Sequence, residues 1–389
     1  LKEEPTVKAE LGATLAEVYG ALGLYQRSDA LVRRMLAIWG VQPETQARQK
    51  IVLGESQLRL ADYEGAARTF RAVASSGLEE APSLRSRALA GLGQALSNLE
   101  RFAEADRVLR EALVIDQRRG PIAAADIARD FEALGINQMY AGELAKAEPL
   151  IRQALAIRLR VEGSASPSVS DNYNTLGSIA YLRGDLPSAE RFFRGNLASD
   201  EKVLGTDHPD TATTRNNLAR VLLEQRRFAE AAPLLEQAMA AGLKERGETH
   251  DLMAFVFSNL GIARRHTGRP AEADALFQQA IGAAREHQHR TLGPTLADLA
   301  EVRCVSGKAR EGSALLAEAA RVSRADYPDD PWRWAWVENV RGECLRRLGR
   351  NAEARQAVIG SMPAIRERWA NGTLFRAEAE RRLQAVVGQ

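Results

Sequence analysis

A short pattern of residues recurs along this chain at intervals of about forty residues. Its clearest copy consists of Leu134, Gly135, Gly142, Leu144 and Ala147: a leucine and a small residue, then a glycine, an apolar residue and an alanine. The small residue falls at positions 16, 54, 93, 135, 177, 219, 261, 300 and 342. A fixed period of this length predicts a solenoid of stacked structural units rather than one closed core.

Each copy of the pattern predicts a pair of antiparallel helices. In the fifth copy, Tyr173, Leu176 and Ala180 recur at three- and four-residue spacing. Gly184 and Asp185 then interrupt this spacing before a second apolar series begins. Two helices joined by a tight turn follow from this order. Because one hairpin cannot bury its apolar face, neighbouring hairpins are expected to stack.

We therefore expect an all-α chain in which nine hairpins and a C-terminal capping helix form one solenoid over residues 1–389. Length alone would suggest about two or three domains, but a continuous repeat overrides that estimate. The capping helix is expected at 373–387, where Leu374, Leu383 and Val386 recur at helical spacing. The expected hairpins are 8–38, 46–76, 85–117, 127–160, 169–203, 210–245, 251–287, 292–325 and 332–369.

Composition restricts the classes of partner. The 53 basic and 51 acidic residues leave a formal net charge of +2, so we expect no nucleic-acid partner. No apolar run approaches the roughly 18 residues that span a bilayer, so we expect no membrane contact by this fragment. The stretch from Arg341 to Arg382 is locally positive, and we expect a solvated exterior there, with an acidic partner surface as the alternative. The chain begins with Leu1 rather than methionine, which suggests a fragment of a longer protein.

Reactive side chains give no sign of catalysis, so we expect no catalytic residue, metal site or cofactor. His287 and His289 are two positions apart, which on a helix directs them to different sides. No sequence string of a known hydrolase, metalloprotease or P-loop is present. Cys304 and Cys344 occupy similar places in neighbouring repeats. We expect both to be buried and unpaired, because neighbouring helices lie about 8–10 Å apart.

The repeat resembles the tetratricopeptide (TPR) family over residues 11–369, and its common 42-residue step resembles the kinesin-light-chain type. The best match is DEKVLGTDHPDTATTRNNLA at 200–219, with a degenerate copy at 161–177. This resemblance implies a right-handed α-α superhelix. Residues 1–38 are similar to the segment that opens the C-terminal TPR region of bacterial, eukaryotic-like Ser/Thr protein kinases.

These resemblances imply a sensory or docking region of a bacterial signalling protein that binds a protein or peptide, with a kinase as the parent. The fragment itself would not be an enzyme. Two alternatives remain open: a stand-alone scaffold or adaptor, and a regulator that binds a small signal molecule or peptide. The compartment is open, periplasmic if the region follows a kinase membrane helix and otherwise cytoplasmic. The ligand and the oligomeric state are also open.

The TPR resemblance also implies where a ligand would bind. In that family, a stripe of residues along each first helix lines a concave groove. Asn174 and Asn216 occupy the same repeat position and resemble the asparagines that hold a peptide backbone in kinesin-light-chain grooves. The alternative is that they bridge neighbouring repeats, since buried amides need partners. The residues expected to line the groove are Glu132, Tyr140, Asn174, Ser178, Tyr181, Asn216, Arg220 and Arg265.

Three tryptophans follow a strong helix-start signal at Asp330 and Pro331. On a helix, Trp332 and Trp336 share one face, whereas Trp334 points away from it. We expect at least one of them to pack at the junction of the eighth and ninth repeats. Exposed tryptophans would instead indicate a partner surface.

Overall fold

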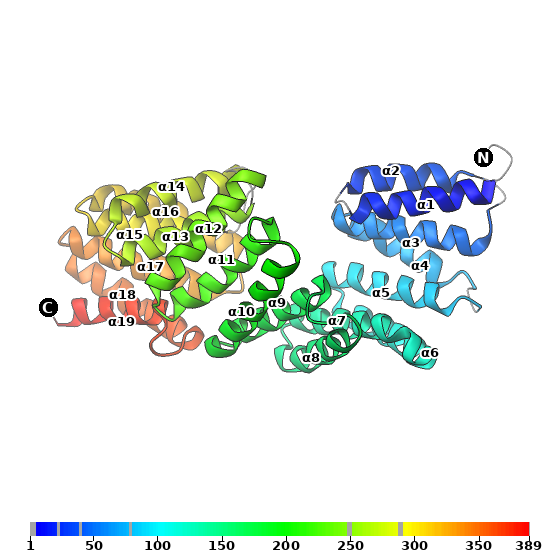
Figure 1. The fold of residues 1–389 in the computed structure, drawn as a ribbon. Helices are drawn as coiled ribbons and strands as arrows, with labels where there is room; N and C mark the ends of the chain where they lie inside the picture. The colour runs from blue at the N-terminus through cyan, green and yellow to red at the C-terminus, as the bar shows by residue number, and fades with distance from the viewer. Residues whose placement is uncertain are drawn as a thin grey trace. The chain divides into compact units, whose positions relative to one another are not determined.

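The computed structural model describes residues 5–21, 24–38, 41–77, 80–246, 251–286 and 291–388. Within these residues, the chain is built from α-helices that pair into antiparallel hairpins (Figure 1). The all-α solenoid fold is therefore confirmed. The chain divides into two compact units, Leu1–Ile179 and Ala180–Gln389, and each is described by itself. The prediction of one continuous solenoid over residues 1–389 stays a prediction.

Unit 1 contains the hairpins α1/α2, α3/α4, α5/α6 and α7/α8 and the greater part of α9. Its helices are α1 (Pro5–Ala21), α2 (Tyr25–Leu36), α3 (Pro43–Arg59), α4 (Tyr63–Ala74), α5 (Pro82–Asn98), α6 (Phe102–Arg119), the short 3₁₀ helix η1 (Gly120–Ala123), α7 (Ala124–Tyr140), α8 (Leu144–Val161) and α9 (Pro167–Leu182).

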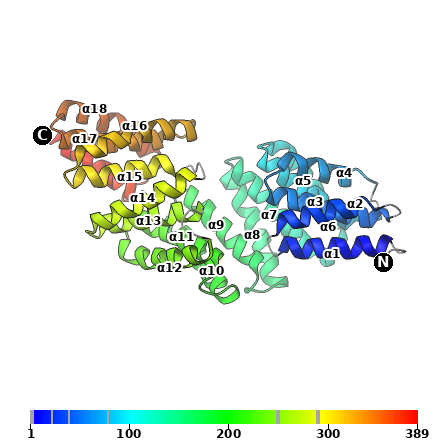
Figure 2. The same cartoon turned by 90° about the horizontal axis from the view of Figure 1, so that it is seen from above.

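Unit 2 begins within the last turn of α9 and contains the helices that follow it, which succeed one another as hairpins from α11 to α18 (Figure 2). They are α10 (Leu186–Val203), α11 (Pro209–Glu224), α12 (Phe228–Arg246), α13 (Asp251–His266), α14 (Pro270–Glu286), α15 (Leu292–Val305), α16 (Ala309–Asp326), α17 (Pro331–Arg347), α18 (Asn351–Arg368) and α19 (Leu374–Val387). None of the described helices of either unit is both long and apolar enough to cross a bilayer.

The small residue of the repeated pattern lets the two helices of a hairpin approach closely. A Cβ atom added at Gly54 would lie 2.6 Å from the ring of Phe70 on the partner helix. At Gly261 the same atom would lie 2.8 Å from Phe277. Larger side chains would therefore separate the helices, which explains why the pattern keeps glycine or alanine at this position.

The turn between the two helices of a hairpin needs a left-handed backbone conformation. Gly142 and Gly184 adopt φ values of 79° and 77° in this turn. The equivalent turns elsewhere place Ala61, Glu100 and Arg226 at φ values of 60°, 58° and 61°. Side chains with a Cβ atom are strained in this region, so these three turns are less favourable than those with glycine.

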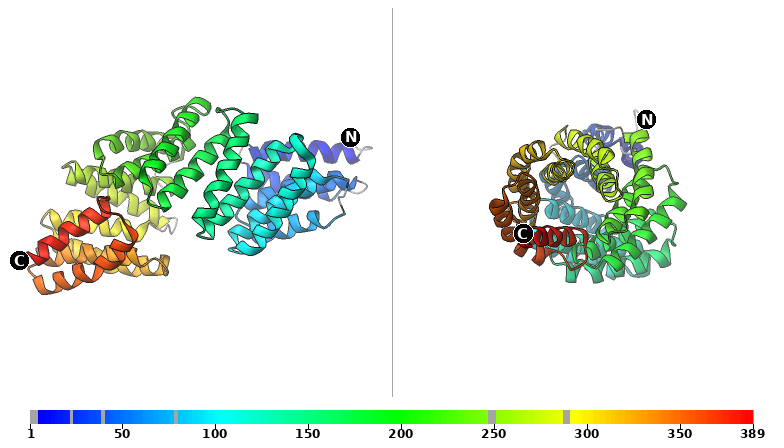
Figure 3. Two further views of the ribbon diagram at one scale, coloured as in Figure 1. Left: turned by 90° about the horizontal axis from the view of Figure 1, so that it is seen from below. Right: turned by 90° about the vertical axis from the view of Figure 1, so that its left-hand side faces the viewer.

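Consecutive first helices, the odd-numbered helices of the hairpins, lie against one another in each unit. In unit 1 these contacts join α1, α3, α5 and α7, and in unit 2 they join α11, α13, α15 and α17. The first helices therefore line the inner side of each curved stack. The last helix, α19, packs against α18 and α17 and also reaches α11 (Figure 3). It thus covers part of the inner side of unit 2.

The expectation of two unpaired cysteines is wrong. Cys304 of α15 and Cys344 of α17 form a disulfide, with their Cα atoms 5.2 Å apart. The expectation failed because the 8–10 Å separation applies to helix axes. Backbone atoms lie about 2.3 Å from their axis, so Cα atoms on facing sides approach within bridging distance.

Candidate functional site

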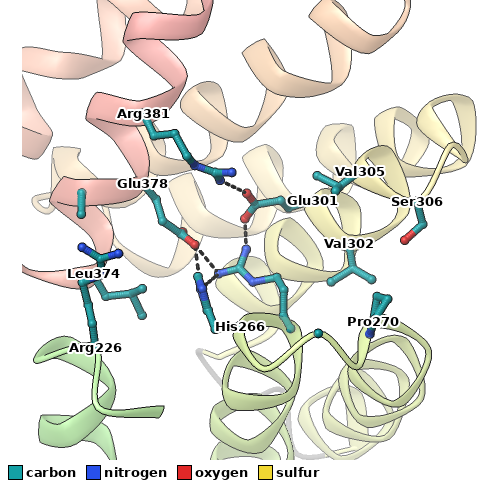
Figure 4. Close-up of a pocket in the computed structure, with 13 residues that line it drawn as sticks. Arg226, His266, Pro270, Glu301, Val302, Val305, Ser306, Leu374, Glu378 and Arg381 are labelled. Atoms are coloured by element: carbon teal, nitrogen blue, oxygen red, sulfur yellow. Dashed lines mark hydrogen bonds and ion pairs between the residues drawn. The ribbon is translucent and has the colours of Figure 1, made fainter. Parts of the chain in front are cut away.

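A cavity of about 740 Å³ lies in unit 2, between the C-terminal ends of α13 and α15 and one side of α19 (Figure 4). One wall is apolar and is formed by side chains of α14, α15 and α19. These apolar side chains are Pro270, Val302, Val305, Leu374 and Ala377. The charged lining consists of three arginines, Arg226, Arg265 and Arg381, and two glutamates, Glu301 and Glu378, with His266 beside them.

Glu378 of α19 is the centre of a buried ion network. Its Oε1 atom accepts a hydrogen bond from Arg265 at 2.9 Å and lies 2.8 Å from Nε2 of His266. Burial alone would raise the pKa of Glu378, but Arg265, the hydrogen bond from His266 and Arg382 together hold that pKa well below its usual value. Glu378 therefore stays ionised and fastens α19 to α13.

Glu301 of α15 is the second buried carboxylate of this network. It is paired with Arg265 from α13 and with Arg382 from α19. Arg382 is 1% exposed, donates to Oδ1 of Asn339 at 2.8 Å, and lies over the ring of Trp336 at 4.6 Å. The expectation that the Arg341–Arg382 stretch is wholly a solvated exterior is thus wrong for Arg382, because α19 turns its polar face toward the first helices.

Two arginines of the cavity are not fully engaged in ion pairs. Among the residues that the structure describes, Arg226 is exposed and has no ion-pair partner. The side chain of Arg381 is 65% exposed, and its ion pair is a 3.5 Å contact with Glu301, which already binds Arg265 and Arg382. Both guanidinium groups are therefore available to an anion that enters the cavity.

His266 is held mainly in its neutral form. Burial lowers the pKa of His266, and the neighbouring charges of Arg265 and Arg381 lower it further, against the opposing effect of Glu378. Its ring also stacks on Phe228, with centroids 4.3 Å apart. The imidazole is thus a fixed, uncharged part of the cavity wall near neutral pH.

Two more acids are buried beside α19. Burial raises the pKa of Glu224 to about 8, although Arg220, Arg368 and a hydrogen bond from the backbone N–H of Leu374 oppose this shift. Leu374 is the first residue of α19, so the carboxylate of Glu224 lies at the positive end of that helix. Burial likewise raises the pKa of Asp298 on α15 to about 7.

Aromatic rings hold the beginning of α19 in place. Phe375 contacts Trp336 at 4.7 Å, Trp369 at 5.2 Å and Trp332 at 5.5 Å between ring centroids. As expected, Trp332 and Trp336 share one face of α17, and both are buried. Trp334 points to the other side and donates to the carbonyl of Ser323 on α16, at the junction of the eighth and ninth repeats.

Four candidate residues belong to unit 1, and none of them is among the residues that line this cavity. Glu132 pairs with Arg158 at 2.8 Å and accepts a hydrogen bond from Asn172 at 2.7 Å. Burial raises the pKa of Glu132, with Arg158 opposing the shift. Tyr140 is 53% exposed. Asn174 and Ser178 are half-buried on α9.

Of the candidate residues in unit 2, Arg265 alone lines the cavity. Asn216 is buried and accepts a hydrogen bond at Oδ1 from Asn259 of the next repeat, 2.9 Å away. This contact is the kind that a structural bridge between repeats would make. The guanidinium of Arg220 lies over the ring of Tyr181 at 4.2 Å. Neither of these two contacts involves a residue that lines the cavity.

The sequence did not single out His266, Glu301, Glu378 or Arg381. Each belongs to a charged helix surface in the sequence pattern, and nothing local distinguishes them from solvated residues. No local signal could have found them, because a Glu and an Arg one turn apart, such as Glu378 and Arg382, are also typical of a solvated helix face. His287 and His289 lie outside the described residues.

Comparisons with known proteins agree with the repeated hairpins. A Tetratricopeptide repeat family profile matches residues 169–244, and a second profile of that description matches residues 51–121 and 216–288. A search of curated protein sequences found no match.

Three solved structures share the fold at low sequence identity. The STAND signal transduction ATPase with a tetratricopeptide repeat sensor from Pyrococcus horikoshii has a TM-score of 0.65 and 16% identity, over 82% of this chain and 48% of that chain. The quorum sensor NprR from B. thuringiensis has a TM-score of 0.62 and 12% identity, over 93% and 100%. A Rap protein complexed with Competence and Sporulation Factor has a TM-score of 0.56 and 15% identity, over 88% and 98%.

Proposed function

The chain is a tetratricopeptide-repeat protein, a scaffold of the protein-interaction type, and we propose that unit 2 binds a peptide segment in the cavity beside α19. The observation that carries this proposal is the pair of available guanidinium groups, Arg226 and Arg381, next to an apolar wall. Three lining arginines face two lining glutamates, so an incoming anion completes the charge balance. The preferred peptide carries a carboxylate beside an aliphatic side chain.

The fold relatives support a peptide ligand. NprR is described as a quorum sensor, and the Rap protein was solved with Competence and Sporulation Factor. At 12% and 15% identity these likenesses concern the fold. A signal peptide is accordingly the first class of ligand to test for this chain.

The proposal extends to a sensory or docking region of a bacterial signalling protein, with a Ser/Thr kinase as its parent. The resemblance of residues 1–38 supports this placement. The Cys304–Cys344 disulfide supports an oxidising compartment such as the periplasm, because thiols of the cytosol are kept reduced. Sequencing the gene upstream tests the parent: a kinase domain and one membrane helix support it. A short leader would indicate a stand-alone scaffold, and a DNA-binding module would indicate a regulator.

A binding assay tests the cavity directly. We would titrate the full chain into fluorescently labelled ten-residue peptides, each with one Glu or Asp beside Leu or Val, and follow polarisation. Arg381→Ala and Arg226→Ala should each weaken the selected peptide by about tenfold or more, since a lost charge-assisted hydrogen bond costs about 1.5–3 kcal/mol. Arg350→Ala is the matched control, because Arg350 forms an exposed pair with Glu353 on α18. Unchanged affinity in both cavity variants would remove the ligand from this cavity.

A further inference from the structure

The connection between α6 and α7 displays an isoleucine to solvent. Ile122 lies in η1, between the ends of these two helices, and is 86% exposed. Where a proline begins a first helix, the next residue is polar or, in one case, the buried Trp332. The polar residues at this position are Thr6, Glu44, Ser83, Ser168 and Asp210. The exposed isoleucine after Pro121 is therefore an exception among these connections.

An apolar pocket of about 380 Å³ lies beside η1, within unit 1. It is formed between the start of α7 and the C-terminal end of α8, and its apolar lining is Pro121, Ala124, Ile127, Ile157 and Val161. Ile122 borders the pocket, because it lies between Pro121 and Ala124 in the chain. We call Ile122 and this pocket the η1 face. A single exposed isoleucine needs no explanation, whereas a joined apolar surface is typical of an interaction site.

A buried ion network holds the η1 face in place. Asp116, near the end of α6, is 0% exposed and pairs with Arg119. Arg119 also lies 2.7 Å from Asp126 of α7. Arg129 of α7 joins the same two carboxylates, at 2.8 Å from Asp126 and 3.4 Å from Asp116. The network connects α6 to α7 on both sides of η1, so the exposed position of Ile122 is set by the packing of these two helices.

Arg160 gives the η1 face its charge preference. Among the described residues, Arg160 is the charged member of the pocket lining, and no acid lines the pocket. Two other arginines of α8, Arg152 and Arg158, pair with glutamates. Arg160 is exposed and forms no ion pair with any residue that the structure describes. A carboxylate beside an apolar side chain therefore complements this surface.

We propose that the η1 face docks an acidic segment of a partner protein. A Leu or Val side chain of that segment enters the pocket, and a neighbouring Glu or Asp meets Arg160. The face is not an unstacked end of the array, because α5, α6, α7 and α8 contact one another in order. The internal stretches outside the described residues are two to four residues long, too short to cover the pocket. Two-fold pairing of two copies would bring Arg160 against Arg160 with no carboxylate between them, which disfavours a second copy as the occupant.

A peptide assay tests the η1 face separately from the cavity of unit 2. The protein is the full chain with Arg226→Ala and Arg381→Ala, and the probes are fluorescently labelled ten-residue peptides with Glu beside Leu. We expect saturable polarisation with at least one of these peptides. Ile122→Asp should weaken that peptide at least tenfold and leave the melting temperature unchanged, because the side chain is 86% exposed. Leu159→Asp is the matched control, since Leu159 is 38% exposed on α8 but does not line the pocket.

A charge exchange gives the decisive comparison. Arg160→Glu should weaken the peptide at least tenfold, and the same peptide with Lys in place of Glu should regain affinity for this variant. No saturable binding, equal affinity after Ile122→Asp, or no regain of affinity would overturn the proposal. Two results would overturn it by assigning another occupant. A dimer in light scattering that Ile122→Asp converts to a monomer would indicate a second copy. Protection of residues 120–124 from hydrogen exchange in the complete gene product, without peptide, would indicate another segment of the same protein.

Discussion

Glu378 joins α19 to Arg265 and His266 of α13, and Glu378→Gln tests how much the docking of α19 depends on it. The substitution keeps the shape of the side chain but removes the charge that binds Arg265 at 2.9 Å and accepts from His266. Arg265 and Arg382 would then share Glu301 as their remaining carboxylate partner in this network. Arg382, which is buried, and Arg265, whose side chain is 12% exposed, would both be left with too little negative charge around them.

The expected cost follows from the burial of the network. Glu378 is 5% exposed and Arg382 is 1% exposed, so water cannot replace the lost interaction. Removing one partner of a buried ion pair typically costs about 3–5 kcal/mol. Glutamine retains one acceptor oxygen, so we expect the lower end, about 3 kcal/mol. For a unit of this size the melting temperature would fall by about 6–12 °C, at about 2–4 °C per kcal/mol.

Two measurements separate local from global effects. Calorimetry of the full chain reports the melting temperature, and hydrogen exchange reports the opening of α19, because repeat arrays do not always unfold in one step. The control is Glu353→Gln, which removes an exposed partner of Arg350 and should leave both readings unchanged. Equal shifts in the two variants, or unaltered exchange in α19 for Glu378→Gln, would refute the argument that the buried network fastens this helix.

Four further outcomes are expected. In the folded state the pKa values of Glu224 and Asp298 are about 8 and 7, above their unfolded values. The contribution of these two groups to the free energy of unfolding is therefore fully present below about pH 4 and is lost as the pH rises through those values. Because the lowered pKa of His266 opposes this trend only up to about pH 6.5, the melting temperature should fall between pH 6.5 and 8.5, and a rise there would contradict the reasoning. Glu100→Gly should stabilise the chain by about 0.5–1 kcal/mol in denaturant titrations, since the φ of 58° is strained for glutamate. Asn216→Ala should destabilise the chain by about 1–3 kcal/mol, because it leaves the buried amide of Asn259 unpaired. Peptide affinity should stay unchanged. Weaker peptide binding with unchanged stability would instead make Asn216 a ligand residue. Cys304→Ser should lower stability by about 3–4 kcal/mol, because the disulfide closes a loop of 40 residues, and a reducing agent should then have no added effect.

The sequence predicted the helix hairpins because their signals are local. The small residue at each step is needed where Gly54 faces Phe70, and the turn glycine is needed where Gly142 has a positive φ. The tryptophan face was likewise predictable, because residues four apart on a helix share a side. Of the eight candidate groove residues, Arg265 alone lines the cavity. The spacing of residues along a first helix gives the side of the helix on which each lies, but it does not say which other helix covers that side.

By itself, the sequence determined the repeat and the pairing of helices, because these depend on contacts between residues a few positions or one repeat apart. Only the tertiary structure decided which charges are buried and where a ligand has room. Glu378 meets Arg265 across 113 residues, and Arg382 meets Glu301 across 81. The disulfide joins helices two apart in order. Such contacts depend on how α19 folds back over the first helices and on how closely the surfaces of two helices approach. The local periodicity of the sequence encodes neither the path of α19 nor the separation of the helices.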